Sequence, residues 1–283
     1  MSVDVLSTLL RALSFVAMFQ AVGVAIALTF LGRRLERALP SIRKLGFLAA
    51  IAGLSLVFAH YALEPARMAG DFSGVLDVTL QRLALESPLS IAAGLRVVGL
   101  ALVAAGVRRE KRIALSAAVI GGLGVIVSFT LVGHTAEASR TTWLKPLLAV
   151  HLLAAAFWFG GLGPLYIATR EEPARRAAEV IAAFTRIATI VVPGLFAVGV
   201  LMTLVLVDAW SAFREGYGLL LLAKIAGFAA LMPFAALNKW VYGPALASSA
   251  PRPAAFRRTI VIECALICAV LAVTAVMTTF FSP

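Results

Sequence analysis

Residues 259–281 read TIVIECALICAVLAVTAVMTTFF, a run of 23 residues that carries a single charged side chain, Glu263. A helix rises about 1.5 Å per residue, so a run of about 20 apolar residues crosses the roughly 30 Å hydrocarbon core of a bilayer. The run therefore predicts a membrane-spanning helix.

Comparable runs recur along the chain, which is 61% hydrophobic and only 14% charged. A soluble domain is nearer half apolar and a quarter charged. The sequence therefore predicts an all-α fold, a polytopic membrane bundle of about eight transmembrane helices, in a single integral membrane domain over residues 1–283. The predicted helices cover residues 5–31, 42–63, 89–107, 113–132, 146–168, 184–207, 218–241 and 259–281.

The predicted helices fall into two groups along the chain. Residues 1–112 hold the first three helices and the longest outer loop, 64–88, which is too small for a separate domain. Residues 113–283 hold the last five helices.

The connections between the helices carry very unequal charge. Fifteen Lys or Arg residues fall in or beside the connections 32–41, 108–112, 169–183 and 242–258, against five in the connections on the other side. Lys and Arg accumulate in cytoplasmic loops, so we expect both termini on the outer, periplasmic side of a bacterial inner membrane. The net charge of +11 then reflects orientation in the lipid bilayer, and we expect no nucleic-acid partner.

Two segments, 121–124 and 160–163, share the order Gly-Gly-Leu-Gly. Small residues let membrane helices approach closely. We therefore expect the helices 113–132 and 146–168 to pack tightly as an antiparallel hairpin.

Only three histidines occur, and the predicted topology places all of them on the outer side. Imidazole binds copper, zinc, iron and nickel, and it is costly to bury in lipid without a partner. The sequence therefore predicts one shallow outer metal site built by His60, His134 and His151. The alternative is that each histidine only forms a hydrogen bond between helices.

Glu64 and Met68 follow His60 at successive spacings of four residues. The three side chains would form one helical stripe if the helix continues through Pro65. Imidazole together with a thioether suits copper better than zinc, calcium or magnesium, so we add Glu64 and Met68 to the predicted copper site. The alternative for Met68 is an ordinary loop residue.

Cys264 and Cys268 lie one turn apart in the inner half of the last helix. A pair of thiolates would suit Cu(I) leaving toward the cytoplasm, which makes them a candidate inner copper relay. The alternative is two small apolar core residues.

Four polar positions at membrane depth complete the candidates: Arg96, Lys224, Asn238 and Glu263. Charges inside a membrane are functional candidates by default, and a structural ion pair is the alternative. Glu263 lies at the depth of Asn238 and Lys239, so we expect it to pair with them. Arg96 and Lys224 lie at a similar outer depth without an obvious acid on a neighbouring helix.

Several short segments of the chain form a recognisable combination. Residues 133–136 read GHTA, residues 151–162 read HLLAAAFWFGGL, and residues 217–224 read YGLLLLAK. Residues 236–238 read ALN, and Glu263 follows early in the last helix. This combination resembles the bacterial copper resistance protein D (CopD) family, best over about residues 115–281.

The resemblance implies an inner-membrane protein of copper homeostasis or resistance. It implies a partner of the CopC type, a periplasmic copper-binding protein, from which copper is taken and moved inward. By this resemblance His134 and His151 are the first metal candidates. The other family-like positions are Trp158, Lys224, Asn238 and Glu263.

No ATP-binding motif occurs, so transport would be passive, driven by the membrane potential or coupled to another ion. One alternative is a membrane redox protein, in which two histidines ligate haem b or a quinone binds, and which oxidises or reduces copper. A copper sensor without transport is a third possibility. No hydrolase motif is present, and we do not expect an enzyme outside that redox alternative.

Overall fold

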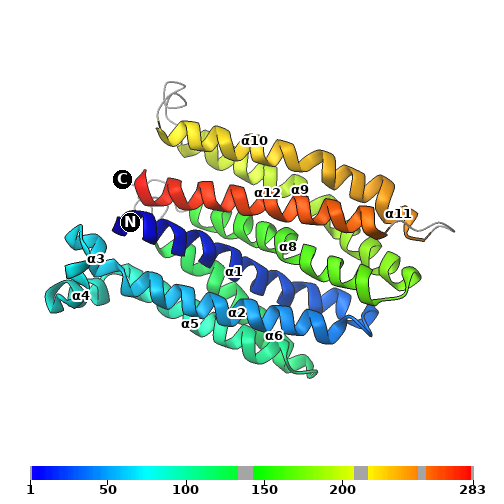
Figure 1. The fold of residues 1–283 in the computed structure, drawn as a ribbon, viewed down its shortest axis with the longest axis horizontal. Helices are drawn as coiled ribbons and strands as arrows, with labels where there is room; N and C mark the ends of the chain where they lie inside the picture. The colour runs from blue at the N-terminus through cyan, green and yellow to red at the C-terminus, as the bar shows by residue number, and fades with distance from the viewer. Residues whose placement is uncertain (1, 133–142, 207–215, 248–252, 282–283) are drawn as a thin grey trace.

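In the part of the chain that the structure describes, eight helices are long and apolar enough to cross a membrane, and they run side by side (Figure 1). The structure, a computed structural model, describes residues 2–132, 143–206, 216–247 and 253–281, and these residues form no strand. The expected all-α membrane bundle is therefore confirmed. The eight helices are α1 (Val3–Leu31), α2 (Leu39–Ala62), α5 (Pro88–Val107), α6 (Arg112–Ser128), α8 (Leu144–Glu171), α9 (Ala174–Leu206), α10 (Gly216–Leu237) and α12 (Pro253–Phe280).

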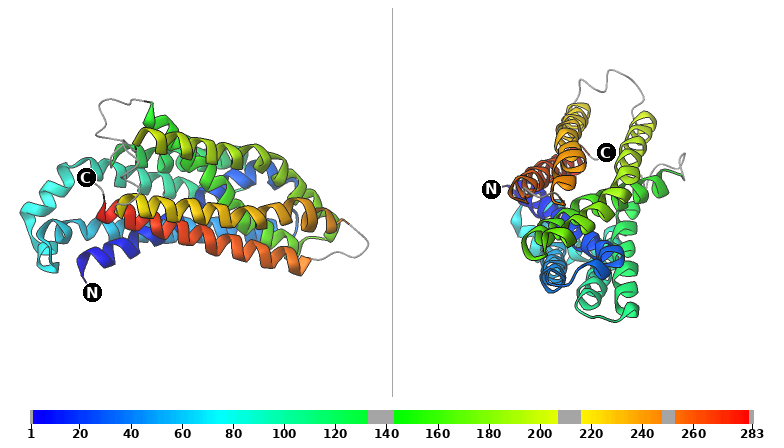
Figure 2. Two further views of the ribbon diagram at one scale, coloured as in Figure 1. Left: turned by 90° about the horizontal axis from the view of Figure 1, so that it is seen from above. Right: turned by 90° about the vertical axis from the view of Figure 1, so that its right-hand side faces the viewer.

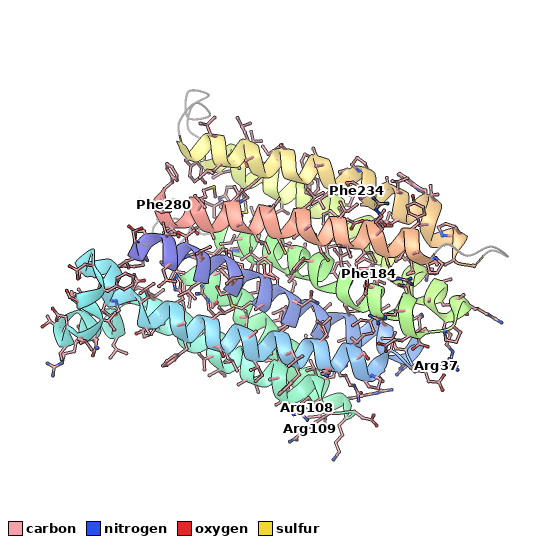
Figure 3. The ribbon with its side chains drawn as sticks, in the orientation of Figure 1. Arg37, Arg108, Arg109, Phe184, Phe234 and Phe280 are labelled. Atoms are coloured by element: carbon pink, nitrogen blue, oxygen red, sulfur yellow. The ribbon has the colours of Figure 1, made fainter. Side chains whose placement is uncertain are left out.

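Both chain termini lie at one end of the bundle, which we call the terminal end (Figure 1). Arg37, Arg108 and Arg109 lie toward the opposite end, which we call the basic end (Figure 3). Short 3-10 turns at Gly32–Arg34 (η1) and Phe129–Leu131 (η3) continue α1 and α6. The asymmetry of charge that the sequence predicts is therefore an asymmetry between the two ends of the fold.

Most of the predicted loop 64–88 is helical. It contains α3 (Glu64–Ala69), η2 (Phe72–Leu76) and α4 (Val78–Glu86), which lie together at the terminal end. The Asp77 side chain starts α4 by accepting hydrogen bonds from the backbone N–H groups of Thr79 and Leu80, at 2.8 and 3.2 Å. Such a cap satisfies donors that the first helical turn leaves free.

Two helices begin earlier than hydropathy predicts. α9 begins at Ala174, well before residue 184, and α12 begins at Pro253 rather than at residue 259. The added turns are polar, and in α9 Arg175 pairs with Glu179 one turn later at 3.4 Å. Hydropathy detects only the part of a helix that lies in lipid, so it misses turns that extend beyond the membrane core.

α1 is the central helix, and α9 and α10 lie at the periphery. Within the most apolar stretch of each helix, 67% of α1 is buried inside the protein, against 6% of α9 and 11% of α10. Seen end-on, α10 and α12 lie together, whereas α9 follows the side of α8 (Figure 2). α9 and α10 therefore expose most of their apolar surface to lipid.

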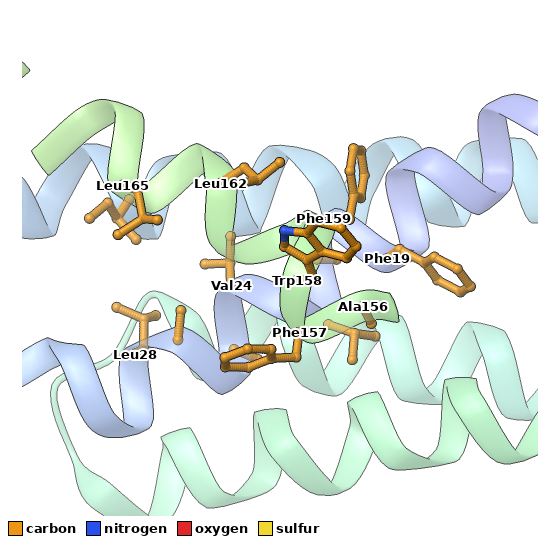
Figure 4. Close-up of a cluster of buried hydrophobic side chains, with 14 of the residues drawn as sticks. Phe19, Val24, Leu28, Ala156, Phe157, Trp158, Phe159, Leu162 and Leu165 are labelled. Carbon is orange, nitrogen blue, oxygen red and sulfur yellow. The ribbon is translucent and has the colours of Figure 1, made fainter. Parts of the chain in front are cut away.

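α1 and α8 approach each other closely at a pair of glycines. A Cβ atom on Gly23 would lie 2.1 Å from the carbonyl oxygen of Ala156 and 2.5 Å from the Cα atom of Gly160. Aromatic side chains of α8, among them Phe157 and Trp158, surround this crossing (Figure 4). Only glycine lets these two backbones meet at this distance.

The predicted glycine contact between α6 and α8 is wrong. Gly121 of α6 packs against the backbone of Gly99 in α5, and Gly160 of α8 packs against Gly23 in α1. A run of small residues indicates that another helix approaches closely, but it does not identify that helix.

Candidate metal route along helix α8

His151 has one ring nitrogen without a partner. Its Nδ1 is buried and has no hydrogen-bond partner among the described residues, whereas the backbone of Leu195 on α9 acts on the ring as a hydrogen-bond partner. In the tautomer that is protonated at Nε2, Nδ1 keeps a lone pair for a metal ion. Histidine ligands to metals commonly donate their other ring N–H to a carbonyl in this way. His151 is thus oriented as a metal ligand requires.

Gly199 of α9 lies beside this free nitrogen. A Cβ atom at that position would stand 3.2 Å from Cε1 and 3.6 Å from Nδ1 of His151. The absence of a side chain at Gly199 therefore keeps the free side of the ring open.

Lys224 of α10 acts on His151 with its positive charge. It forms no ion pair with any of the described residues. A cation at His151 is therefore opposed by this charge, so ligands that bind copper there must outweigh the repulsion.

Three aromatic rings lie deeper in the membrane than His151. Trp158 follows His151 by seven residues, which places it on the same face of α8 about 10 Å further from the terminal end. Its ring contacts Phe228 of α10 edge-on at 5.9 Å between centroids, and Phe228 stacks on Phe196 of α9 at 5.2 Å. We call Trp158, Phe196 and Phe228 the aromatic plug, because it joins α8, α9 and α10 at one level.

A buried carboxyl group lies on the other side of the plug. Glu263 of α12 is only 2% exposed, and Asn238 Nδ2 donates to its Oε1 at 2.6 Å. The Thr259 hydroxyl donates to Asn238 Oδ1, which fixes the direction of the amide. Trp158 also acts on Glu263 as a hydrogen-bond donor. The carboxyl group is therefore surrounded by neutral donors.

The backbone widens at this point. Residues Asn238–Tyr242 form a π-helix (η5) that leads from α10 into the short α11 (Gly243–Ala245). Single π-turns inside helices occur frequently at functional sites. The predicted pairing of Glu263 with Asn238 is confirmed. The predicted pairing with Lys239 is wrong, because the Lys239 ammonium lies over the Trp240 ring at 5.1 Å instead.

His60 lies in a different environment from His151. It is 7% exposed at the end of α2, where Arg11 of α1 donates to its Nε2 at 3.3 Å and Ser7 Oγ lies 3.3 Å from the same atom. The lone pair of this nitrogen is therefore occupied. His60 would have to leave Arg11 before binding a metal through Nε2.

Glu64 and Met68 do not continue an unbroken stripe from His60. α2 ends at Ala62 and α3 begins at Glu64. The carboxylate of Glu64 pairs with Arg67 at 3.0 Å, and Met68 is 40% exposed. Both carboxylate oxygens of Glu64 accept from the Arg67 guanidinium, so they are engaged in this structure.

Cys264 and Cys268 are free thiols on α12. Both are half-buried and pack against the main hydrophobic core. They follow Glu263 toward the middle of the bundle, within about 8 Å along the helix axis.

The described residues contain no group of three or more His, Cys, Asp or Glu side chains that could hold a metal ion. The third expected ligand, His134, lies outside the described residues. The structure joins Asn238 to Glu263 by a hydrogen bond, and the charge of Lys224 acts on His151. It places His60 among arginines, away from any free ligand in the part of the chain that it describes.

Sequence reasoning missed one charged residue of this bundle, Arg11. Ser7, Arg11, Ser14 and Met18 recur at helical spacing along α1, and Ser7, Ser14 and Met18 are buried. This polar stripe inside an apolar helix was the signal that could have revealed it. The aromatic plug left no such signal, because Phe196 and Phe228 are ordinary residues of an apolar helix.

Comparisons with protein families match both halves of the chain. Residues 1–143 match the copper resistance protein D-like, N-terminal domain, and residues 178–277 match copper resistance protein D. Comparisons with curated proteins and with solved structures give no significant match. The second match contains Lys224, Asn238 and Glu263, and it also covers the α9 and α10 members of the aromatic plug. The chain is therefore a copper resistance membrane protein that belongs to the copper resistance protein D family.

Proposed function

We propose that this protein moves copper across the membrane from the terminal end to the basic end, along the face of α8 that carries His151 and Trp158. His151 is the entry ligand, and His134 is proposed as its second ligand. The aromatic plug closes the middle of the route, and Glu263 receives the cation beyond it. Cys264 and Cys268, which follow Glu263 on α12 toward the terminal end, are a proposed thiol relay.

One observation carries this proposal, the position of Trp158. It shares a face of α8 with His151, its ring contacts Phe228, and it acts as a hydrogen-bond donor to Glu263. A free imidazole nitrogen, an aromatic barrier and a buried carboxyl group thus follow one another in order of depth. A cation that crosses the bilayer needs polar groups along its path.

The charge asymmetry supports inward movement. The basic end faces the cytoplasm under the rule that Lys and Arg accumulate there, so the terminal end faces the periplasm of a bacterial inner membrane. A cation that moves toward a negative interior gains about 2.3 kcal/mol per charge for each 100 mV. Copper would arrive from a periplasmic protein of the CopC type, bound at the terminal end.

The test is uptake of radioactive copper into liposomes that contain the purified protein. We expect saturable uptake driven by a negative interior, lost in His151→Ala and retained in Val150→Ala. Val150 is the matched control because it precedes His151 on the same helix and is 54% exposed. Equal uptake by the wild type and by empty liposomes would overturn the proposal.

The optical spectrum of the same sample separates transport from redox chemistry. A colourless protein that imports copper supports the proposal. A Soret band at about one haem per chain would assign His151 to haem b and favour copper oxidation or reduction.

A further inference from the structure

Three arginines gather around His60 at the terminal end of the bundle. Arg11 of α1, Arg67 of α3 and Arg96 of α5 all act on His60 with their positive charges. We call these three residues the arginine cluster. They lie in the N-terminal half of the protein, and the proposed copper route uses none of them.

Among the residues that the structure describes, only one member of the cluster forms ion pairs with carboxylates. Arg67 pairs with Glu64 at 3.0 Å and lies 3.9 Å from Asp4. Its Nε is nevertheless buried without a hydrogen-bond partner. The carboxylates of Glu64 and Asp4 are therefore already engaged by Arg67.

Arg11 has only neutral partners among the described residues. Its Nη1 donates to the backbone carbonyl of Thr278 at 2.6 Å, and its Nε donates to His60 at 3.3 Å. These contacts fix the guanidinium plane between α1, α2 and α12. They bring no negative charge to Arg11, and the Glu64 carboxylate acts on it only from a distance while it pairs with Arg67.

The contacts of Arg96 among the described residues are also neutral. Its Nε donates to the Ser128 hydroxyl at 3.0 Å, and its guanidinium carbon lies 4.6 Å from the centroid of the Phe129 ring. Arg11 and Arg96 also act on each other as like charges. Two guanidinium groups that repel each other inside a membrane protein are costly unless an anion joins them.

We propose that the arginine cluster binds a phosphate group, with Arg11 and Arg96 as its principal ligands. A guanidinium presents a planar fork of N–H donors that matches phosphate oxygens in a two-point contact. Each of these arginines lies eight residues from the start of its helix, about 12 Å along the axis. α1, with 29 residues, exceeds the roughly 30 Å core, whereas α5, with 20 residues, just spans it, so the site lies in the outer half of the membrane.

His60 is a positioning residue for this site. Its Nε2 accepts from Arg11, and it therefore stays neutral and aims the guanidinium. The phosphate would come from an anionic phospholipid or from free phosphate, since both present the same oxygens. Binding of phosphate from either source is independent of the proposed copper route.

The experiment measures thermal unfolding of the purified full chain in detergent. Inorganic phosphate is added against chloride at equal ionic strength, and phosphatidylglycerol is added against phosphatidylcholine. Saturating ligand raises Tm by about 5 °C for a protein of this size, and we expect that shift for at least one of the two phosphates. We expect Arg11→Gln and Arg96→Gln to lose most of it. Arg82→Gln, on the exposed surface of α4, is the control and keeps the full shift.

The outcomes separate the sources. A shift with phosphatidylglycerol alone assigns a lipid, and a shift with inorganic phosphate assigns a soluble anion. If Arg11→Gln fails to fold, Arg96→Lys and the phosphorus content of the wild-type protein replace it. No shift with either phosphate in the wild type, or equal shifts in the wild type and Arg96→Gln, would overturn the proposal.

Discussion

Asn238 Nδ2 lies 2.6 Å from Glu263 Oε1, and this hydrogen bond joins the π-helix after α10 to the buried face of α12. The Thr259 hydroxyl donates to the amide oxygen of Asn238, so the amide presents only its N–H donor to the carboxyl group. No described residue forms an ion pair with Glu263. A carboxylate with donors but without a cation is arranged to receive one, either a metal ion or a proton.

Glu263→Gln removes the charge and keeps a side chain of the same shape. We expect copper uptake into liposomes to fall about tenfold or more, because the amide cannot hold the cation beyond the plug. The folded protein should unfold at an unchanged or higher temperature, because a buried carboxyl group is replaced by a neutral one. Glu179→Gln is the control, since Glu179 lies on the polar start of α9 with 56% of its side chain exposed. Uptake that matches the wild type would remove Glu263 from the route.

Gly199→Ala tests the free side of His151. The new methyl group would lie 3.2 Å from Cε1 and 3.6 Å from Nδ1, which narrows the space for a metal ion. We expect copper affinity to fall about tenfold, the size of change that alterations beside a metal ligand commonly produce. The measurement is copper titration against a chelator of known affinity.

Gly194→Ala is the matched control for Gly199→Ala. It lies on the same helix, and an added Cβ there meets nothing within 4 Å. Equal losses in both variants would attribute the effect to α9 itself and not to the space beside His151.

Phe228→Ala opens the aromatic plug. An ion that passes the plug must separate these rings, and each aromatic contact contributes about 0.5–1.5 kcal/mol. Removal of one ring should therefore lower the barrier to ion passage, and we expect the uptake rate to rise about threefold. The initial rate of copper entry into liposomes measures this change. Leu222→Ala is the control, because Leu222 is 44% exposed on the same helix. A slower rate in Phe228→Ala would mean that the rings conduct the ion and do not block it.

Gly23→Ala tests the central crossing of α1 and α8. The methyl group would meet the Ala156 carbonyl oxygen at 2.1 Å, so one of the helices must shift. We expect the free energy of unfolding to drop by about 2–3 kcal/mol, as overpacking in a core commonly costs. Thermal unfolding in detergent gives the value. Gly94→Ala, whose Cβ meets nothing within 4 Å, should be neutral or slightly stabilising.

Hydropathy was sufficient to predict the eight spanning helices, because a bilayer forces each apolar run of that length into a helix. It could not predict that α9 begins at Ala174, because the first turns there are polar. The helical content of 64–88 was missed for the same reason, since α3 and α4 are short and depend on caps such as Asp77.

The pairing of Asn238 with Glu263 was predictable from depth, because buried polar groups at one level of a membrane seek each other. The partners of the glycines were not, since Gly160 is equally suited to approach any neighbouring helix. His60 could not be interpreted correctly while Arg11 was overlooked. Its partner lies 49 residues away in sequence, and only the fold brings them within 3.3 Å.

The proposed route depends on copper binding to His151 through its Nδ1. X-ray absorption of the protein loaded with one equivalent of copper tests it directly, by detecting scattering from imidazole rings around the metal. We predict an imidazole signal in the wild type and in Val150→Ala that is weakened or lost in His151→Ala. An unchanged imidazole signal in His151→Ala, with unchanged copper content, would contradict the account.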